Sequence, residues 1–178
     1  MSDLRKKQTQ RTEETKRALK EAFCRLYVTK PINKISITEV CRIAGYNRST
    51  FYQYYVDLDD ILLEIENETV DYIKLKRKNI AFSDSDFIFE LMLLYEDRKV
   101  YMDAMLGENS TPRFFNNLIS LATTNITDFD FDKNDPHYPY LVEFRYKGAL
   151  SIFRLWIQRN RDLDFEDLLL MIRKMYQI

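Results

Sequence analysis

The sequence predicts an all-α protein, and three observations support this fold class. The 178 residues include only three Gly and four Pro, too few for the frequent tight turns of an all-β or doubly wound α/β fold. Apolar side chains recur every three or four positions over long stretches, which is the spacing of one helix face. Ser36 and Asn47 each precede such a stretch, where a helix N-cap is expected.

Two helices are expected within the first 45 residues. The first covers residues 12–28, where apolar and charged faces alternate with helical spacing. The second covers 37–44, because Ser36 and Glu39 have the spacing of a capping box. Gly45 follows, and it can adopt the left-handed conformation that ends a helix.

A short helix over 48–55 follows the Gly45 turn and is capped by Asn47. Two short helices joined by a tight glycine-containing turn form a helix-turn-helix. A long fourth helix over 57–78 begins with acidic residues and is long enough to link two domains. The remaining expected helices cover 87–96, 99–106, 112–124, 140–158 and 165–176.

Charge differs strongly between the two parts of the chain. The whole chain has a net charge of −1, but residues 1–56 contain 12 Lys and Arg against 5 Asp and Glu, a net of +7. Residues 57–178 contain 15 against 23, a net of −8. A basic region is expected where a protein meets a polyanion, although a solvated basic face gives the same count. We therefore treat 1–56 as one domain with a basic N-terminal arm, and 57–178 as a second helical domain.

The residue patterns of enzymes and metal proteins are not found in the sequence. His137 is the only histidine, which excludes a histidine-based catalytic dyad and a site with several His ligands. Asp128, Asp130 and Asp132 imitate the start of a calcium loop, but Lys133 occupies the position that requires Gly. We therefore expect no catalytic residue, no metal and no cofactor.

Cysteine usage and hydropathy indicate the compartment. Cys24 and Cys41 lie within apolar helical patterns, which is typical of buried free thiols in a reducing environment. No stretch reaches 18 consecutive apolar residues, and no apolar run follows the basic residues near the N-terminus. The sequence therefore predicts a cytoplasmic protein without a signal peptide or membrane span.

The helix-turn-helix region has a specific pattern. The string SITEVCRIAGYNRSTFYQYY at 36–55, followed by Asp59, Ile61 and Leu62, combines a capped helix, an Ala-Gly turn, an aromatic-rich second helix and an acidic start to the next helix. It resembles the DNA-binding signature of TetR (tetracycline repressor)-type transcription regulators. The resemblance implies a homodimer that binds double-stranded operator DNA through 1–56 and receives a signal through 57–178.

The second helix of this motif needs a polar face for DNA and an apolar face for its own domain. Phe51 and Tyr55, four residues apart, are expected in the core. Arg48 is expected to read a guanine edge with two hydrogen bonds, which gives about 1–3 kcal/mol of discrimination. Phosphates are expected to contact tyrosines, threonines and the N–H groups of the first cap. The predicted DNA-binding residues are Ser36, Thr38, Asn47, Arg48, Ser49, Thr50, Tyr52 and Tyr54.

Two features bear on how strongly DNA is bound. The family usually has a phosphate-binding lysine where this chain has Leu58, and the loss of one contact should flatten the salt dependence by about one unit. The basic arm, which contains Arg5, Lys6, Lys7 and Arg11, could compensate along the phosphates or in the minor groove. The alternative for the arm is a disordered, solubilising tail.

The C-terminal part more weakly resembles a TetR subgroup that includes regulators of dihydroxyacetone kinase operons, through residues 94–98, 114–115, 148–149 and Trp156. Its aromatic and Met side chains either line a cavity for a small apolar or aromatic effector or fill a helical core. The residues predicted for the cavity are Tyr95, Met102, Met105, Phe115 and Phe144.

The helices expected over 140–158 and 165–176 resemble the two helices through which this family dimerises as a four-helix bundle. Small residues allow close helix approach there, beside an apolar stripe, although a monomer could fold the same residues onto its own core. The predicted interface residues are Gly148, Ala149, Ile152, Trp156, Leu168 and Ile172.

Two functions from different classes are compatible with these patterns. The first is a sequence-specific transcription regulator, a repressor released by a small effector. The second is a protein of the same fold that acts through protein partners, with or without operator binding. Leu58 and the atypical Tyr46 support the second function.

Overall fold

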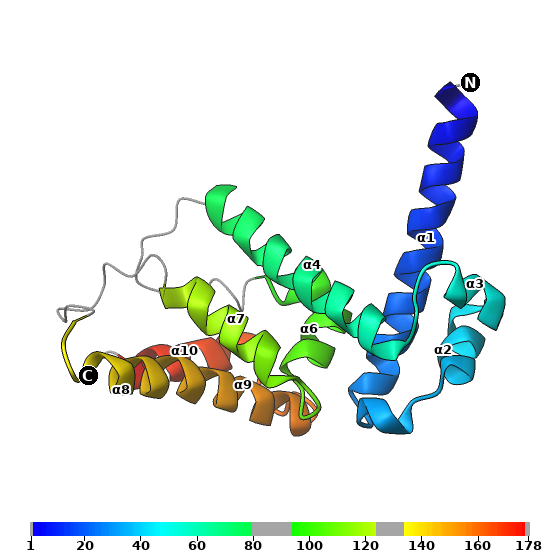
Figure 1. The fold of residues 1–178 in the computed structure, drawn as a ribbon. Helices are drawn as coiled ribbons and strands as arrows, with labels where there is room; N and C mark the ends of the chain where they lie inside the picture. The colour runs from blue at the N-terminus through cyan, green and yellow to red at the C-terminus, as the bar shows by residue number, and fades with distance from the viewer. Residues whose placement is uncertain (1, 80–93, 124–133, 177–178) are drawn as a thin grey trace. The chain divides into compact units, whose positions relative to one another are not determined.

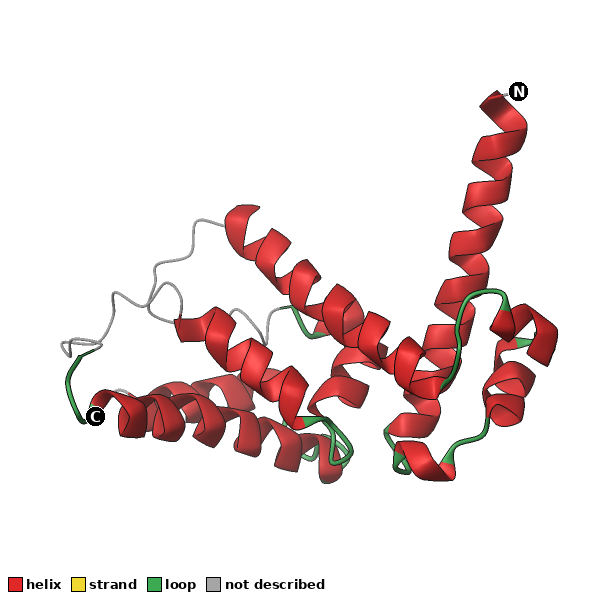
Figure 2. Ribbon diagram, in the orientation of Figure 1, coloured by secondary structure: helices red, strands yellow, loops and turns green. Residues whose placement is uncertain are grey.

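The computed structural model describes residues 2–79, 94–123 and 134–176. All regular elements within these ranges are helices, and no strand occurs among them (Figures 1 and 2). The chain divides into two compact units, Met1–Glu68 and Thr69–Ile178, called unit 1 and unit 2 below. The division falls inside α4 (Leu58–Asn79), which is the helix that the sequence predicts as a link. The all-α prediction is confirmed.

Unit 1 contains α1 (Ser2–Tyr27), a 3₁₀ turn at Ile32–Lys34, α2 (Ile37–Ala44), α3 (Arg48–Tyr52) and the first half of α4. The bounds of α2 agree with the prediction. Helix α3 is three residues shorter than expected, because the chain turns after Tyr52 and the N–H groups of both Tyr54 and Tyr55 bond to the carbonyl of Phe51. The core of unit 1 includes Leu19, Phe23, Tyr27, Val40, Phe51, Ile61 and Ile65.

Helix α1 begins at Ser2, ten residues before the predicted start, so the basic arm is helical rather than a disordered tail. The prediction relied on apolar periodicity, which residues 2–11 lack. These residues are mostly Lys, Arg and Gln, which are good helix formers. An existing helix is extended much more easily than a new one is started, so the arm continues the helix that packs on the core.

A cluster of ion pairs joins α1 to the first half of α4 within unit 1. The ammonium of Lys20, whose side chain is 7% exposed, lies 3.2 Å from Glu64 and 2.6 Å from Glu68. Lys16 pairs with Glu64 at 2.8 Å, and the Tyr55 hydroxyl donates to the same carboxylate at 3.5 Å. Burial raises the pKa of Glu64, but hydrogen bonds from Lys16 and Lys20 outweigh it and hold that pKa below its usual value. The cluster thereby fixes α1, α4 and the end of the α3 turn together.

Unit 2 contains the second half of α4, a 3₁₀ turn at Glu96–Arg98, α6 (Lys99–Leu106), α7 (Pro112–Thr123), α8 (Tyr138–Val142), α9 (Gly148–Gln158) and α10 (Phe165–Tyr176). A π-helical segment, Glu143–Lys147, joins α8 to α9, so the helix predicted over 140–158 is one run with a wider turn inside it. Most of the helix predicted over 87–96 and of the acidic loop at 128–136 lies outside the described residues.

The core of unit 2 is built around Tyr95. Its ring packs against Phe153, Trp156 and Phe165 at centroid distances of 5.1, 5.7 and 6.2 Å. Its hydroxyl donates to Asp103 at 2.5 Å and accepts from Arg161 Nε at 2.9 Å. The polar end of this fully buried side chain is thus paired, as a buried hydroxyl requires.

The first prediction concerns the ion-pair cluster of unit 1. The double variant Glu64→Gln, Glu68→Gln leaves the buried Lys20 ammonium without a counter-charge. We expect the free energy of unfolding to fall by about 2–3 kcal/mol, slightly less than for a fully buried pair, because Glu68 is partly exposed. Adding Lys20→Met should restore much of the loss, since it removes the buried charge.

Chemical denaturation followed by circular dichroism measures both changes. The matched control is Asp71→Asn, which breaks the exposed Asp71–Lys74 pair and should change the free energy of unfolding by less than about 0.5 kcal/mol. If the double variant is as stable as the wild type, the ion pairs do not hold α1 to α4.

Candidate nucleic-acid interface

The start of α2 is fixed by the predicted capping box. Ser36 Oγ accepts from the Glu39 N–H at 3.3 Å, and Glu39 Oε2 accepts from the Ser36 N–H at 3.0 Å. Lys30 Nζ donates to the other Glu39 oxygen at 2.7 Å. The hydrogen bond from Lys30, followed by those from Ser36, lowers the pKa of Glu39 to about 2. Thr38, in the first turn, is exposed.

The turn between α2 and α3 depends on a glycine and an asparagine. Gly45 has φ 76°, the left-handed conformation predicted for it, and ends α2. Asn47 then caps α3, because its Oδ1 accepts from the Thr50 N–H at 2.8 Å. The hydroxyls of Ser49 and Thr50 donate to the same oxygen at 2.6 and 3.0 Å. These three predicted DNA-binding residues therefore already form the local structure that orients α3.

Helix α3 has an apolar face and a polar face, as expected. Phe51 and Tyr55 are buried in the core of unit 1, which confirms their predicted role. Arg48 and Tyr52, one turn apart, lie on the exposed side. Arg48 Nη2 donates to the Tyr52 hydroxyl at 3.2 Å, and the guanidinium lies 5.8 Å from the centre of the Tyr52 ring. Tyr52 thus holds the arginine in position, a pairing that the sequence analysis did not predict.

A groove lies between the first half of α1 and α3 in unit 1. Its volume is about 1020 Å³. It includes Thr50 and Tyr54, which were predicted as DNA-binding, and Lys7 and Arg11 of the basic arm. The lining residues are Lys7, Gln8, Gln10, Arg11, Thr12, Glu14, Thr15, Tyr46, Thr50, Gln53 and Tyr54. Lys7 and Arg11 are four residues apart, so on a helix they lie on one face. Had the arm been predicted as helical, this spacing would have indicated that α1 forms one wall of the groove.

The residues predicted for an effector cavity lie in different surroundings. Tyr95, Met102 and Met105 are fully buried and fill the core of unit 2. Phe115 lies under the Arg154 guanidinium, 4.6 Å from the ring centre, and Phe144 is 69% exposed. Tyr95, Met102 and Met105 thus follow the alternative stated for them, that they fill a helical core.

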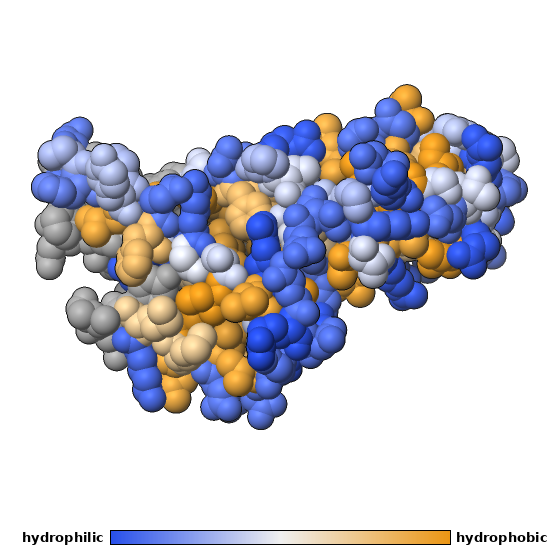
Figure 3. Space-filling view, turned by 90° about the horizontal axis from the view of Figure 1, so that it is seen from below, coloured by the Kyte–Doolittle hydropathy of each residue, from blue (hydrophilic) through white to orange (hydrophobic). Residues whose placement is uncertain are grey.

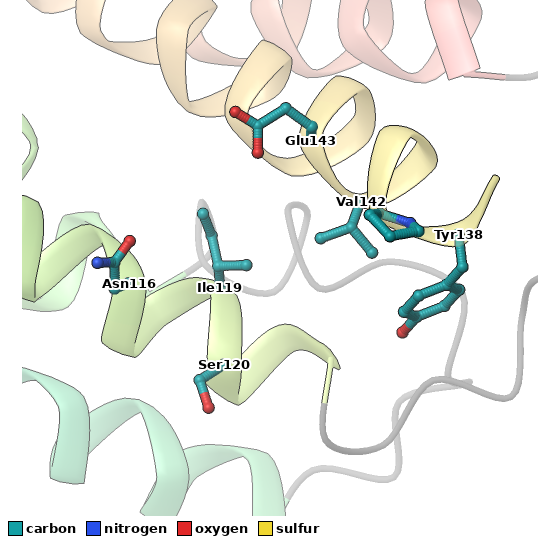
Figure 4. Close-up of a pocket in the computed structure, with 7 residues that line it drawn as sticks. Asn116, Ile119, Ser120, Tyr138, Val142 and Glu143 are labelled. Carbon is teal, nitrogen blue, oxygen red and sulfur yellow. The ribbon is translucent and has the colours of Figure 1, made fainter. Parts of the chain in front are cut away.

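A pocket of about 580 Å³ is present elsewhere in unit 2, between α7 and α8 (Figure 4). Figure 4 shows Asn116, Ile119 and Ser120 on α7 across from Tyr138 and Val142. Pro139 and Glu143 complete its lining.

Four of the six residues predicted for the dimer interface are buried within unit 2 itself. Trp156 donates its indole N–H to the Leu163 carbonyl at 2.8 Å and packs on Phe153 and Phe165. The other three are Ala149, Leu168 and Ile172, while Gly148 and Ile152 are half-buried. These helices bury one apolar face in their own core, so an interface requires their other face.

That other face also carries apolar side chains. Tyr140, Phe144 and Leu155 are exposed along the run from α8 to α9, and α10 exposes others. Figure 3 shows apolar residues reaching the surface of this part of the chain. The exposed apolar residues of α10 are Leu170, Met171 and Met175.

Neither a metal-ligand cluster nor a membrane-length helix occurs in the part of the chain that the structure describes. In the described ranges, no three His, Cys, Asp or Glu side chains gather closely enough to hold a metal ion. None of the described helices is both long and apolar enough to cross a membrane.

Comparison with known proteins identifies a similar fold. No protein-family model and no curated protein sequence matches the chain. A solved structure of a TetR transcriptional regulator from Streptococcus agalactiae matches with a TM-score of 0.65 and 18% sequence identity, over 94% of this chain and 96% of that one. The chain therefore has a TetR-like fold. This match does not support the subgroup of dihydroxyacetone kinase regulators.

Proposed function

We propose that the protein is a transcription regulator that binds duplex DNA through α2 and α3. The observation that carries this proposal is the exposed face of α3, where Arg48 is held by Tyr52 at the start of a helix capped by Asn47. Helix α3 has the position of a recognition helix in a helix-turn-helix, which enters the major groove with its N-terminal residues toward the bases. The TetR-like fold and the net charge of +7 in residues 1–56 add support.

The exposed side chains of α2 and α3 carry the donor groups that contacts with bases and phosphates need. A guanidinium can donate two hydrogen bonds to guanine O6 and N7, so Arg48 is the proposed base-reading residue. Phosphate contacts are proposed for Thr38, Tyr54 and Tyr52, whose hydroxyl accepts from Arg48 and can still donate its own proton to a phosphate. The cap residues Asn47, Ser49 and Thr50 hold α3 in place, so their effect on DNA is proposed to be mainly indirect.

The second prediction concerns the base-reading residue. Arg48→Ala should reduce discrimination by about 1–3 kcal/mol at one base pair of each half-site and leave affinity for unrelated duplexes much less affected. Binding sequences are selected from a random duplex pool with the wild type and then compared by fluorescence anisotropy. Arg17→Ala, an exposed residue of α1 outside the groove, is the control for charge. An equal loss on all sequences would exclude base reading by Arg48.

We also propose that the protein acts as a homodimer through the exposed apolar faces of α9 and α10. Large apolar patches on a soluble protein usually mark an interaction surface, and a helix-turn-helix dimer places two recognition helices on two half-sites. We propose exposed Phe144 and Leu155 as interface residues, instead of the predicted interface residues that are buried within unit 2.

The third prediction tests this interface. The double variant Phe144→Glu, Leu155→Glu should be monomeric in sedimentation at concentrations where the wild type is a dimer, because two charges would be desolvated at the contact. Its circular dichroism should be unchanged, since both side chains are exposed. Leu75→Glu, on an equally exposed residue of α4, should remain dimeric. A dimeric Phe144→Glu, Leu155→Glu protein would place the interface elsewhere.

A small effector is proposed to act through the pocket between α7 and α8. Its volume of about 580 Å³ is within the usual range for small-molecule sites, and its wall combines apolar Ile119 and Val142 with polar Asn116 and Ser120. A ligand that prefers one arrangement of the protein changes DNA binding only through its differential affinity for that arrangement.

The fourth prediction concerns this pocket. In a thermal-shift screen of small apolar and aromatic compounds, a ligand at 100 times its Kd should raise Tm by about 5–10 °C. Ile119→Trp, which fills the pocket, should abolish the shift, whereas Asn117→Trp on the exposed side of α7 should retain it. A shift that persists in Ile119→Trp would place the ligand elsewhere.

The alternative function, a regulator that acts through protein partners and has lost operator binding, rests on two residues. Leu58 cannot bind a phosphate, and Tyr46 is engaged with α1 through Thr15. This alternative predicts that the selection from random duplexes enriches no sequence while the protein remains folded and dimeric.

A further inference from the structure

We infer that the groove between α1 and α3 holds one sugar-phosphate strand of the bound duplex, with Lys7 and Arg11 as phosphate ligands. This inference rests on the proposed function, because it places the strand that borders the major groove entered by α3. It adds α1, which a helix-turn-helix does not by itself include, to the DNA-binding surface.

Within unit 1, the groove has one helical wall and one wall formed by α3 and the turn that follows it. One wall is the first half of α1, which extends past α2 and α3 (Figure 1). The other wall is formed by Thr50 and Tyr54 with Gln53 between them. Since Thr50 belongs to α3 and Gln53 and Tyr54 follow it directly, a strand beside α3 would be within reach of α1.

The spacing of the walls is fixed by a contact between them. Thr15, which is 4% exposed, donates its hydroxyl to the Arg11 carbonyl at 2.9 Å and lies 3.4 Å from the Tyr46 hydroxyl. Tyr46 follows the Gly45 turn, so this contact ties the α2–α3 turn to α1. The ion pairs of Lys16 and Lys20 with α4 hold the next turn of α1 in place.

The side chains of the groove suit a phosphodiester. Lys7 and Arg11 lie one helical turn apart, about 6 Å along the axis, and face the same stretch of the groove. Within the residues that the structure describes, neither cation pairs with a carboxylate, whereas Lys16 and Lys20 both do. Hydroxyls and side-chain amides make up most of the remaining lining, and groups of this kind donate to phosphate oxygens. The hydroxyls of Thr15 and Thr50 are already used within unit 1, whereas Gln8 and Gln53 carry amides that can donate.

One residue that lines the groove, Glu14, would repel a phosphate. Glu14 accepts from Gln10 Nε2 at 3.1 Å and leaves the groove with a formal charge of +1 from two cations and one carboxylate. Its removal should therefore strengthen binding, which gives a test of opposite sign to the loss of Lys7 and Arg11.

The fifth prediction uses salt dependence, which can be measured on any duplex without knowledge of the operator. In the full-length protein, Lys7→Gln, Arg11→Gln should reduce the slope of log K against log salt by about 1.8 per bound protomer, because each lost phosphate contact removes about 0.9. The matched control is Arg17→Gln, Arg25→Gln, which removes two exposed cations of α1 that do not line the groove. Its slope should change much less. Glu14→Gln should bind more tightly than the wild type at the same salt concentration.

The outcomes separate this inference from the proposed function. If the wild type binds duplex DNA and the two double variants have the same slope, the groove does not hold a strand and the role of α3 is unaffected. If Glu14→Gln weakens binding, the groove does not hold an anion. If the wild type binds no duplex at all, the proposed function fails first. Circular dichroism and thermal unfolding of each variant establish that it is folded.

Discussion

The geometry of unit 1 depends on the ion pairs of the nearly buried Lys20. Its ammonium is paired with two carboxylates of α4, and one of them also accepts from Tyr55 at the end of the α3 turn. A charge removed from water is tolerated only with such partners, so α1 and α4 are held in one arrangement. That arrangement determines which face of α3 is buried through Phe51 and which face remains exposed. The proposed base-reading surface is therefore supported by an ion-pair cluster that reaches α3 only through Tyr55.

The same side chains have two roles in this surface. Asn47, Ser49 and Thr50 form a cap, and Tyr52 binds the guanidinium that is proposed to read the bases. Part of the hydrogen-bonding capacity of the motif is thus used within unit 1, and Arg48 is already restrained by its neighbour. Restraint of this kind reduces the side-chain entropy lost on binding. In the proposed complex, specificity then depends on the cap residues, which touch no base, as well as on Arg48.

The fold was largely predictable from sequence because caps and apolar spacing are local signals. Ser36, Gly45 and Asn47 mark the ends of α2 and α3, and the structure has them in those roles. The arm was less predictable, since residues 2–11 have no apolar face and are helical by propensity and by continuity with α1. The sequence could not decide the surroundings of the residues predicted for the cavity and the interface. Periodicity shows that Met105, Trp156 or Ile172 lies on an apolar face, but not which partner that face meets.

The continuity of α1 affects the thermodynamics of complex formation. A disordered arm that folds on DNA loses conformational entropy and adds to the negative heat-capacity change of binding. Helix α1 is already formed from Ser2 onward, so a contribution from Lys7 and Arg11 requires little ordering of the backbone. The association is then expected to be favoured by the release of counterions, an entropic gain, with little heat capacity assigned to the arm.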